Sequence, residues 1–164
     1  MNESRQDILD AFTGAMKELD HIIETMPEDS LDWAKSETEW SIRQVIHHLA
    51  DDGNVYTFII ERGLATPGCK VFFGGFPGNE QWAERLDFNQ RSIEPALKLM
   101  RAQRVFLAEL VARFPDRWDN KVGYYNESGE ELAERTVAEM IVMLTEHMEE
   151  HIQMIVEILE SKGA

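Results

Sequence analysis

The sequence lacks the features that define several classes of protein. It contains one cysteine, Cys69, so no disulfide can form within the chain. It has 16 lysines and arginines against 31 aspartates and glutamates, and its net charge of −15 offers no basic stripe to nucleic acid or to an anionic membrane surface. No window approaches the roughly 18 consecutive apolar residues of a membrane span, and the first residues lack the pattern of a secretion signal. These absences predict a cytoplasmic protein without nucleic-acid or membrane partners.

The chain does contain enough apolar sequence to build a core. Hydrophobic residues make up 43% of its 164 residues, which is typical of a folded domain rather than of a disordered chain. At this length, one domain covering residues 1–164 is expected.

Four segments carry apolar residues at the three- and four-residue spacing of amphipathic helices. They are residues 8–26, 42–63, 93–114 and 136–159. Three of them have, at or just before their start, a pair of residues with the spacing of a capping box: Ser4 with Asp7, Ser41 with Gln44, and Thr136 with Glu139. Four long helices in so short a chain predict an all-α fold, namely a four-helix bundle.

Two segments interrupt this pattern. Residues 63–79 contain five glycines and two prolines around four apolar anchors, so we expect a long middle connection that allows a crossover between helices. Asn79 is then expected to cap a short helix that runs through Trp82 to Leu86. Residues 122–125 and the following turn at residues 126–129 predict a small hairpin.

The histidines differ in the direction that helical periodicity gives them. His48 falls on the flank of the apolar face of its helix, whereas His47 is expected to face water. Asp52 lies one turn after His48 on the same side, and Asp51 is expected to point away. On the last helix, His147 and His151 both fall towards the apolar side.

The spacing of His147 and His151 allows two imidazoles on one helix face to reach a single ion. Such a pair also arises by chance, and a lone inward histidine is usually a satisfied core residue. Two inward imidazoles without an ion, however, would each lack a partner at a cost of about 1–3 kcal/mol per group. Since helices pack about 8–10 Å apart, His48 can join them. The pattern therefore predicts a metal site of His48, His147 and His151, with Asp52 as a fourth ligand, as a partner that holds His48, or as a residue in water.

Residues 40–51, which read WSIRQVIHHLAD, together with the later pair His147 and His151, resemble the DinB/YfiT-like superfamily of bacterial four-helix-bundle metalloproteins. The resemblance spans the whole chain. It implies that one histidine of the second helix and both of the last helix bind a divalent metal, commonly nickel, zinc or iron. Carried over, these are His48, His147 and His151. The resemblance also implies a homodimer, for which the residues give no separate indication.

Three neutral imidazoles leave a metal its full charge and open positions, as in catalytic rather than structural sites. One hypothesis is a thiol S-transferase that activates a low-molecular-weight thiol for attack on a small-molecule electrophile, and the resemblance favours it. A second is a hydrolase that uses hydroxide formed from a bound water. A third is a helical module for binding or dimerisation without catalysis. The aromatic residues of the 63–79 connection, with Trp82, Tyr124 and Tyr125, are candidates for the wall of a pocket, whereas Cys69 is expected to be incidental.

Overall fold

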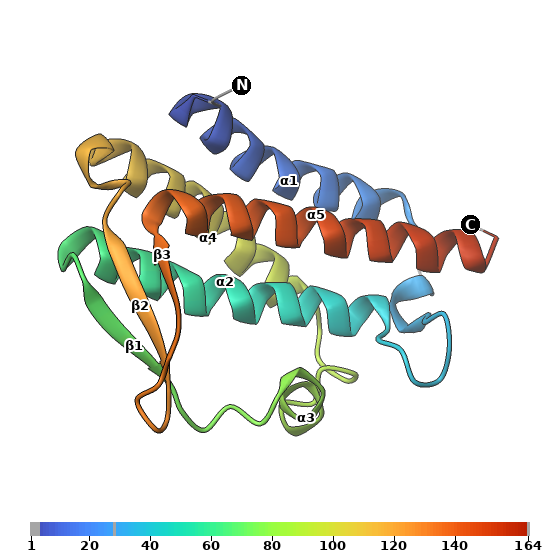
Figure 1. Cartoon of the computed structure of the whole chain (residues 1–164). Helices are drawn as coiled ribbons and strands as arrows, with labels where there is room; N and C mark the ends of the chain where they lie inside the picture. The colour runs from blue at the N-terminus through green and yellow to red at the C-terminus, as the bar shows by residue number, and fades with distance from the viewer. Residues whose placement is uncertain (1–3, 28, 164) are drawn as a thin grey trace.

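The computed structural model describes residues 4–27 and 29–163, and four long helices form most of it (Figure 1). The long helices are α1 (Arg5–Thr25), α2 (Ile42–Ala65), α4 (Glu94–Arg113) and α5 (Val137–Ser161). The shorter elements are η1 (Ser30–Asp32), β1 (Cys69–Phe73), α3 (Asn79–Arg85), η2 (Pro115–Arg117), β2 (Lys121–Asn126) and β3 (Glu131–Thr136). The predicted four-helix bundle is confirmed, and the predicted short helix is α3.

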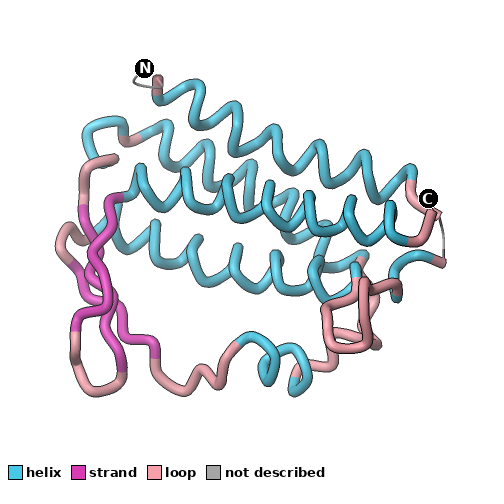
Figure 2. The backbone as a smooth tube through the Cα atoms, turned by 45° about the vertical axis from the view of Figure 1, so that its right-hand side comes forward, coloured by secondary structure: helices cyan, strands magenta, loops and turns pink. Residues whose placement is uncertain are grey.

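The order of the helices in space includes the predicted crossover. Helices α2 and α4 are consecutive long helices, yet they run in the same direction, and so do α1 and α5 (Figure 1). Each helix packs against its own parallel partner and against one helix of the other pair, with α2 beside α5 and α1 beside α4. Helices α1 and α2 therefore lie diagonally across the bundle. The chain returns from the end of α2 to the start of α4 through β1, a loop and α3. This return segment passes along the outside of α2 (Figures 1 and 2).

Capping boxes begin three of the four long helices, as the sequence predicts. Ser41 Oγ accepts a hydrogen bond from the backbone N–H of Gln44, and the Gln44 side chain accepts one from the backbone N–H of Ser41. The same reciprocal pair joins Thr136 and Glu139 at the start of α5. Because these caps fix where α2 and α5 begin, they also fix which way the histidines further along each helix point.

A small three-stranded sheet closes one end of the bundle, where the sequence predicts only a hairpin. Strands β2 and β3 form that hairpin, and β1 adds to it in parallel, with Cys69 opposite Val122 and Phe73 opposite Asn126. Glycines and prolines flank β1, and its partner lies about fifty residues away, so local periodicity gave no signal for this strand. The sheet anchors the beginning of the return segment against α2 and α5.

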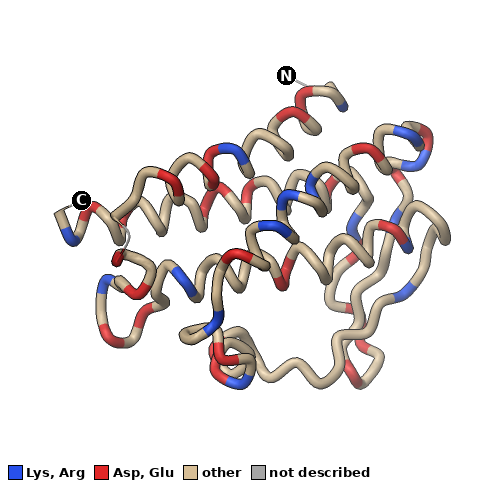
Figure 3. Tube along the Cα trace, turned by 180° about the vertical axis from the view of Figure 1, so that it is seen from behind, with Lys and Arg blue, Asp and Glu red and all other residues tan. Residues whose placement is uncertain are grey.

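The core occupies the interior of the bundle in two adjoining halves. One half lies between the part of α2 and α5 that carries the histidines and the neighbouring helices. It includes Ile42, Val45, Leu49, Met148 and Ile155. The other half lies beneath the sheet and includes Trp118, whose indole N–H donates to the Val111 carbonyl. Acidic positions outnumber basic ones over the surface, and the two are interspersed along the helices (Figure 3). Among the described helices, none combines the length and apolarity that crossing a membrane requires.

Candidate metal centre

His48 lies in the interior of α2, where its side chain faces α5. The residue is only 6% exposed, and the Trp40 indole packs edge-on against its ring, with 4.9 Å between ring centroids. Trp40 immediately precedes the capping residue Ser41, so the cap that starts the helix also places this aromatic cover. His48 is therefore held rigidly with one ring edge directed at α5.

His147 and His151 meet His48 from successive turns of α5. Their ring centroids lie 4.4 Å apart, and those of His147 and His151 lie 5.2 Å and 5.0 Å from that of His48. One ring nitrogen from each of the three residues lies within 4.8 Å of the other two. Helices α2 and α5 thus bring His48 together with two imidazoles that lie about a hundred residues later in the sequence.

The hydrogen bonding of these rings is incomplete in a way that suits a cation. His48 Nε2 and His147 Nε2 lie 3.3 Å apart, so only one of them can donate a hydrogen bond to the other. The buried His151 Nδ1 has no hydrogen-bond partner in the described chain. Burial, reinforced by the neighbouring histidines, lowers the pKa of His48 to about 3 and that of His151 to about 4. Neutral imidazoles with free lone pairs are what a divalent transition metal requires, so the residues fit such an ion.

Asp52 lies beside two of the three rings. Its Oδ2 is 3.7 Å from His48 Nε2 and 3.5 Å from His147 Nε2, which is beyond a good hydrogen bond. Burial raises the pKa of the Asp52 carboxyl, with His147 opposing the rise and Asp51 adding to it. Asp52 is therefore a partly buried carboxyl group at the edge of the cluster, with an affinity for protons above that of an ordinary aspartate.

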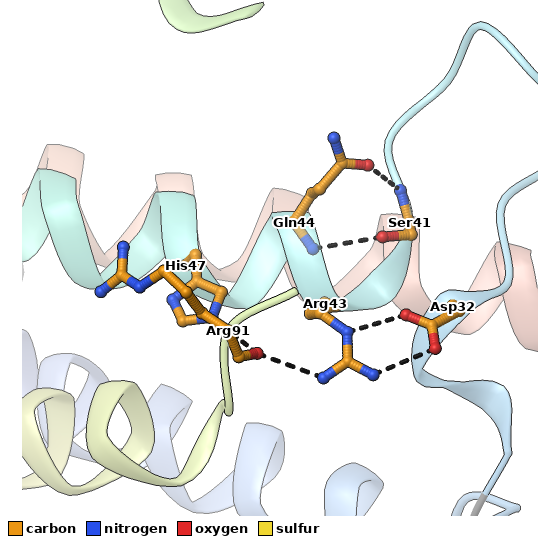
Figure 4. Close-up of polar contacts among 6 residues, drawn as sticks. All are labelled: Asp32, Ser41, Arg43, Gln44, His47 and Arg91. Atoms are coloured by element: carbon orange, nitrogen blue, oxygen red, sulfur yellow. Dashed lines mark hydrogen bonds and ion pairs between the residues drawn. The ribbon is translucent and has the colours of Figure 1, made fainter. Parts of the chain in front are cut away.

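The prediction that His47 faces water is wrong. His47 is only 2% exposed, and its Nε2 lies 3.3 Å from the Arg91 carbonyl oxygen (Figure 4). Its ring also packs against that of Phe88, with 5.4 Å between centroids. Arg43 bonds the same carbonyl and also pairs with Asp32. The return segment before α4 covers this side of α2, and periodicity within one helix cannot reveal such a cover. His47 nevertheless lies outside the cluster, so the two adjacent histidines have different surroundings.

A cavity of about 630 Å³ adjoins the cluster, between α2 and the return segment. Its volume falls within the range of about 300–1,000 Å³ that is typical of small-molecule sites. His48 and Asp52 line one part of it, and Phe73, Phe76 and Trp82 of the return segment line another. The predicted aromatic wall is thus present in part. Tyr124 and Tyr125 do not line the cavity, because the Tyr124 hydroxyl is buried against Met140 and Tyr125 pairs with Glu131.

Asp51 also lines this cavity, although helical direction predicted that it points away. Its Oδ2 accepts a hydrogen bond of 2.7 Å from the Trp82 indole N–H. This contact ties α3 to α2 across the cavity. Asp51 does point away from the bundle core, as its helical angle predicted. It nevertheless does not face open water, because the return segment packs over this side of α2.

Comparisons with known proteins agree with this architecture. A family model of the DinB superfamily matches residues 11–155. The chain belongs to the DinB superfamily. No curated protein matches its sequence. Among solved structures, YfiT from Bacillus subtilis, described as "a probable metal-dependent hydrolase with an unusual four-helix bundle topology", is similar with a TM-score of 0.81 and 19% sequence identity. The match covers 99% of this chain and 91% of YfiT, and at this identity it shows a shared fold.

Within this DinB-superfamily chain, sequence reasoning indicated the aromatic residues of the return segment but missed Asp51. Asp51 had no distinguishing signal, because its place in the cavity lining depends on the return segment that packs over it. Cys69 is buried at the start of β1, opposite Val122 and outside the cavity lining. Its position gives it a packing role in the core beneath the sheet.

Proposed function

We propose that this protein is a metal-dependent enzyme whose divalent metal is held by His48, His147 and His151, and that it transfers a low-molecular-weight thiol to an electrophile. The observation that carries the proposal is the convergence of three imidazoles, one of which, His48, lines a cavity large enough for both a thiol and its acceptor. A histidine cluster without function would gain nothing from such a cavity. Nickel, zinc and iron all suit imidazole ligands, so the donor set favours this group of metals.

A divalent ion bound by three neutral imidazoles lowers the pKa of a coordinated thiol or water, so that a nucleophile forms near neutral pH. Asp52 is placed to take the released proton on Oδ2, since it lies at the cavity beside His48 and His147 and burial raises its pKa. In the transfer, the thiol sulfur forms a bond to the electrophilic carbon. The leaving group departs with the electrons of the broken bond. Trp40 excludes water from the far side of His48.

Hydrolysis is the second candidate, and the description of the structurally similar YfiT favours it. The same residues would serve, with Asp52 taking a proton from water instead of from a thiol. A binding or dimerisation module without catalysis is favoured less, because its function would not require a polar cluster open to a cavity.

Metal analysis of protein purified without a histidine tag tests the metal site. We expect about one equivalent of divalent metal in the wild type, and much less in each of His48→Ala, His147→Ala and His151→Ala. His47→Ala is the matched control, because it removes a neighbouring buried imidazole outside the cluster and should keep the metal. Equal metal content in all four variants would refute the site.

Turnover with and without an added thiol separates the two reactions. We expect the metal-loaded protein to conjugate 1-chloro-2,4-dinitrobenzene to a small thiol with release of chloride, and to lose this activity after chelation. A hydrolase would instead cleave 4-nitrophenyl acetate in the absence of thiol. Conjugation that is insensitive to metal removal and to His151→Ala would contradict the proposed transferase.

A further inference from the structure

Part of the cavity lining has no role in the proposed reaction. It includes Asp51, Phe76 and Trp82. The Trp82 indole N–H donates to Asp51 Oδ2, and the Phe76 and Trp82 rings lie 5.7 Å apart. This arrangement combines a carboxylate of α2 with two aromatic rings, one from α3 and one from the loop before it. Both of these segments lie beside α2 (Figure 1).

The charge of the cavity wall has one sign. Its described lining includes Asp51 and Asp52 but no lysine or arginine, and neither aspartate forms an ion pair with a lysine or arginine in the described chain. Arg135 does not line the cavity, although its charge opposes the rise that burial causes in the pKa of Tyr56. An anionic group would thus find no basic side chain on this wall, whereas a cation would find a carboxylate and aromatic faces.

The two aspartates are adjacent in α2 but have different neighbours. Asp52 lies beside the His48 and His147 rings, where its charge would offset that of a metal held there. Asp51 is bound to Trp82 of α3, so its charge has no such compensation. Because adjacent residues of a helix point about 100° apart, the two carboxylates can contact separate parts of a ligand in the cavity.

We propose that Asp51, Phe76 and Trp82 form a subsite for an organic ammonium group, so that the substrate is a small molecule with an amine at one end and its reacting atom at the other. This inference rests on the proposed function, since it names the class of substrate that the cavity admits. The ammonium group pairs with Asp51 and lies against the faces of the aromatic rings, while the reacting end extends to His48 and Asp52.

Three probes of matched size test the subsite: 3-phenylpropylamine, 3-phenylpropanol and 3-phenylpropanoate. Binding is measured by calorimetry on the metal-free full-length protein at pH 7, because a carboxylate probe would otherwise bind the metal itself. We expect the amine to bind about tenfold more tightly than the alcohol, and the carboxylate to bind more weakly than either. The preference for the amine should decrease as salt is raised.

Asp51→Asn tests the charge while keeping an oxygen that can accept the Trp82 hydrogen bond. We expect this substitution to weaken the binding of the amine by about tenfold and to change the affinity for the alcohol by less than about twofold. Glu84→Gln is the matched control, since it removes one negative charge from an exposed position of α3 that does not line the cavity. It should leave the affinities of all three probes unchanged.

Several results would overturn the subsite. One is tight binding of the carboxylate, and another is the absence of binding of any probe. The others are an equal loss of affinity for the amine and the alcohol in Asp51→Asn, and a loss of affinity for the amine in Glu84→Gln as large as in Asp51→Asn. These outcomes are separate from those for the proposed function. A protein that binds metal and turns over but shows no preference for the amine loses only the subsite. A protein without metal or turnover that still prefers the amine loses only the proposed reaction.

Discussion

Substitution of His151 gives the sharpest test of the histidine cluster. Replacing this histidine is expected to stabilise the metal-free protein but to weaken metal binding. In the metal-free protein its Nδ1 is buried without a hydrogen-bond partner. An unsatisfied buried polar group costs about 1–3 kcal/mol, and an apolar side chain of similar volume removes that cost. His151→Leu should therefore make the metal-free protein more stable. For a chain of this length the gain corresponds to a rise in Tm of roughly 2–12 °C.

Added metal should make the wild type more stable than His151→Leu, which reverses their order of thermal stability. A ligand at 100 times its Kd stabilises the folded state by about 2.7 kcal/mol, which corresponds to a rise in Tm of roughly 5–11 °C for the wild type. His151→Leu, with one ligand removed, should show little or no rise. Thermal melting by circular dichroism, with chelator and with added Ni²⁺ or Zn²⁺, measures both effects.

An exposed histidine provides the matched control. His21→Leu makes the same chemical change on the surface of α1 and should alter the free energy of unfolding by less than about 0.5 kcal/mol in either condition. If metal-free His151→Leu were less stable than the wild type by 1 kcal/mol or more, on the order of one lost hydrogen bond, the ring would have to be satisfied without metal. That result would refute the reasoning from the unpaired nitrogen.

Further predictions concern pH, the buried His47 and two glycines. Because burial holds the pKa of His48 at about 3 and of His151 at about 4, the unfolded chain takes up protons first as pH falls below about 6.5. The metal-free protein should thus lose stability from about pH 6.5 downwards, and urea midpoints that stay flat between pH 7.5 and 4.5 would contradict this. His47→Ala should cost about 1–3 kcal/mol through the lost contacts with Phe88 and the Arg91 carbonyl, with metal content unchanged by elemental analysis. Gly63→Ala should cost about 1–3 kcal/mol in urea unfolding, because the added Cβ would lie 2.9 Å from Val122. Gly14→Ala meets nothing within 4 Å in α1 and should instead stabilise by about 0.5–1 kcal/mol, so equal effects of the two alanines would refute the packing argument.

The parts of this structure that local sequence predicts are those that local forces build. The capping boxes at Ser41 and Thr136 and the apolar stripes after them locate α2 and α5, because both signals act over three to four residues. The long glycine-rich connection also indicates the crossover, since only a long return lets α4 run parallel to α2. By contrast, β1 has no local signal strong enough to outweigh its flanking glycines and prolines, and it forms because β2 is there to pair with it.

The sequence by itself determined the four helices, where three of them begin, and that His48, His147 and His151 lie towards the apolar side of their helices. Only the tertiary structure decided that these rings converge, that His47 is covered, and that Asp51 faces a cavity instead of water. The physical reason is the range of the interactions. Which side of a helix a residue occupies is set by its position relative to neighbours within one or two turns. What surrounds that side depends on which distant segment packs over it. Here that segment is the return from α2 to α4, and it turns one outer side of a helix into the wall of a site.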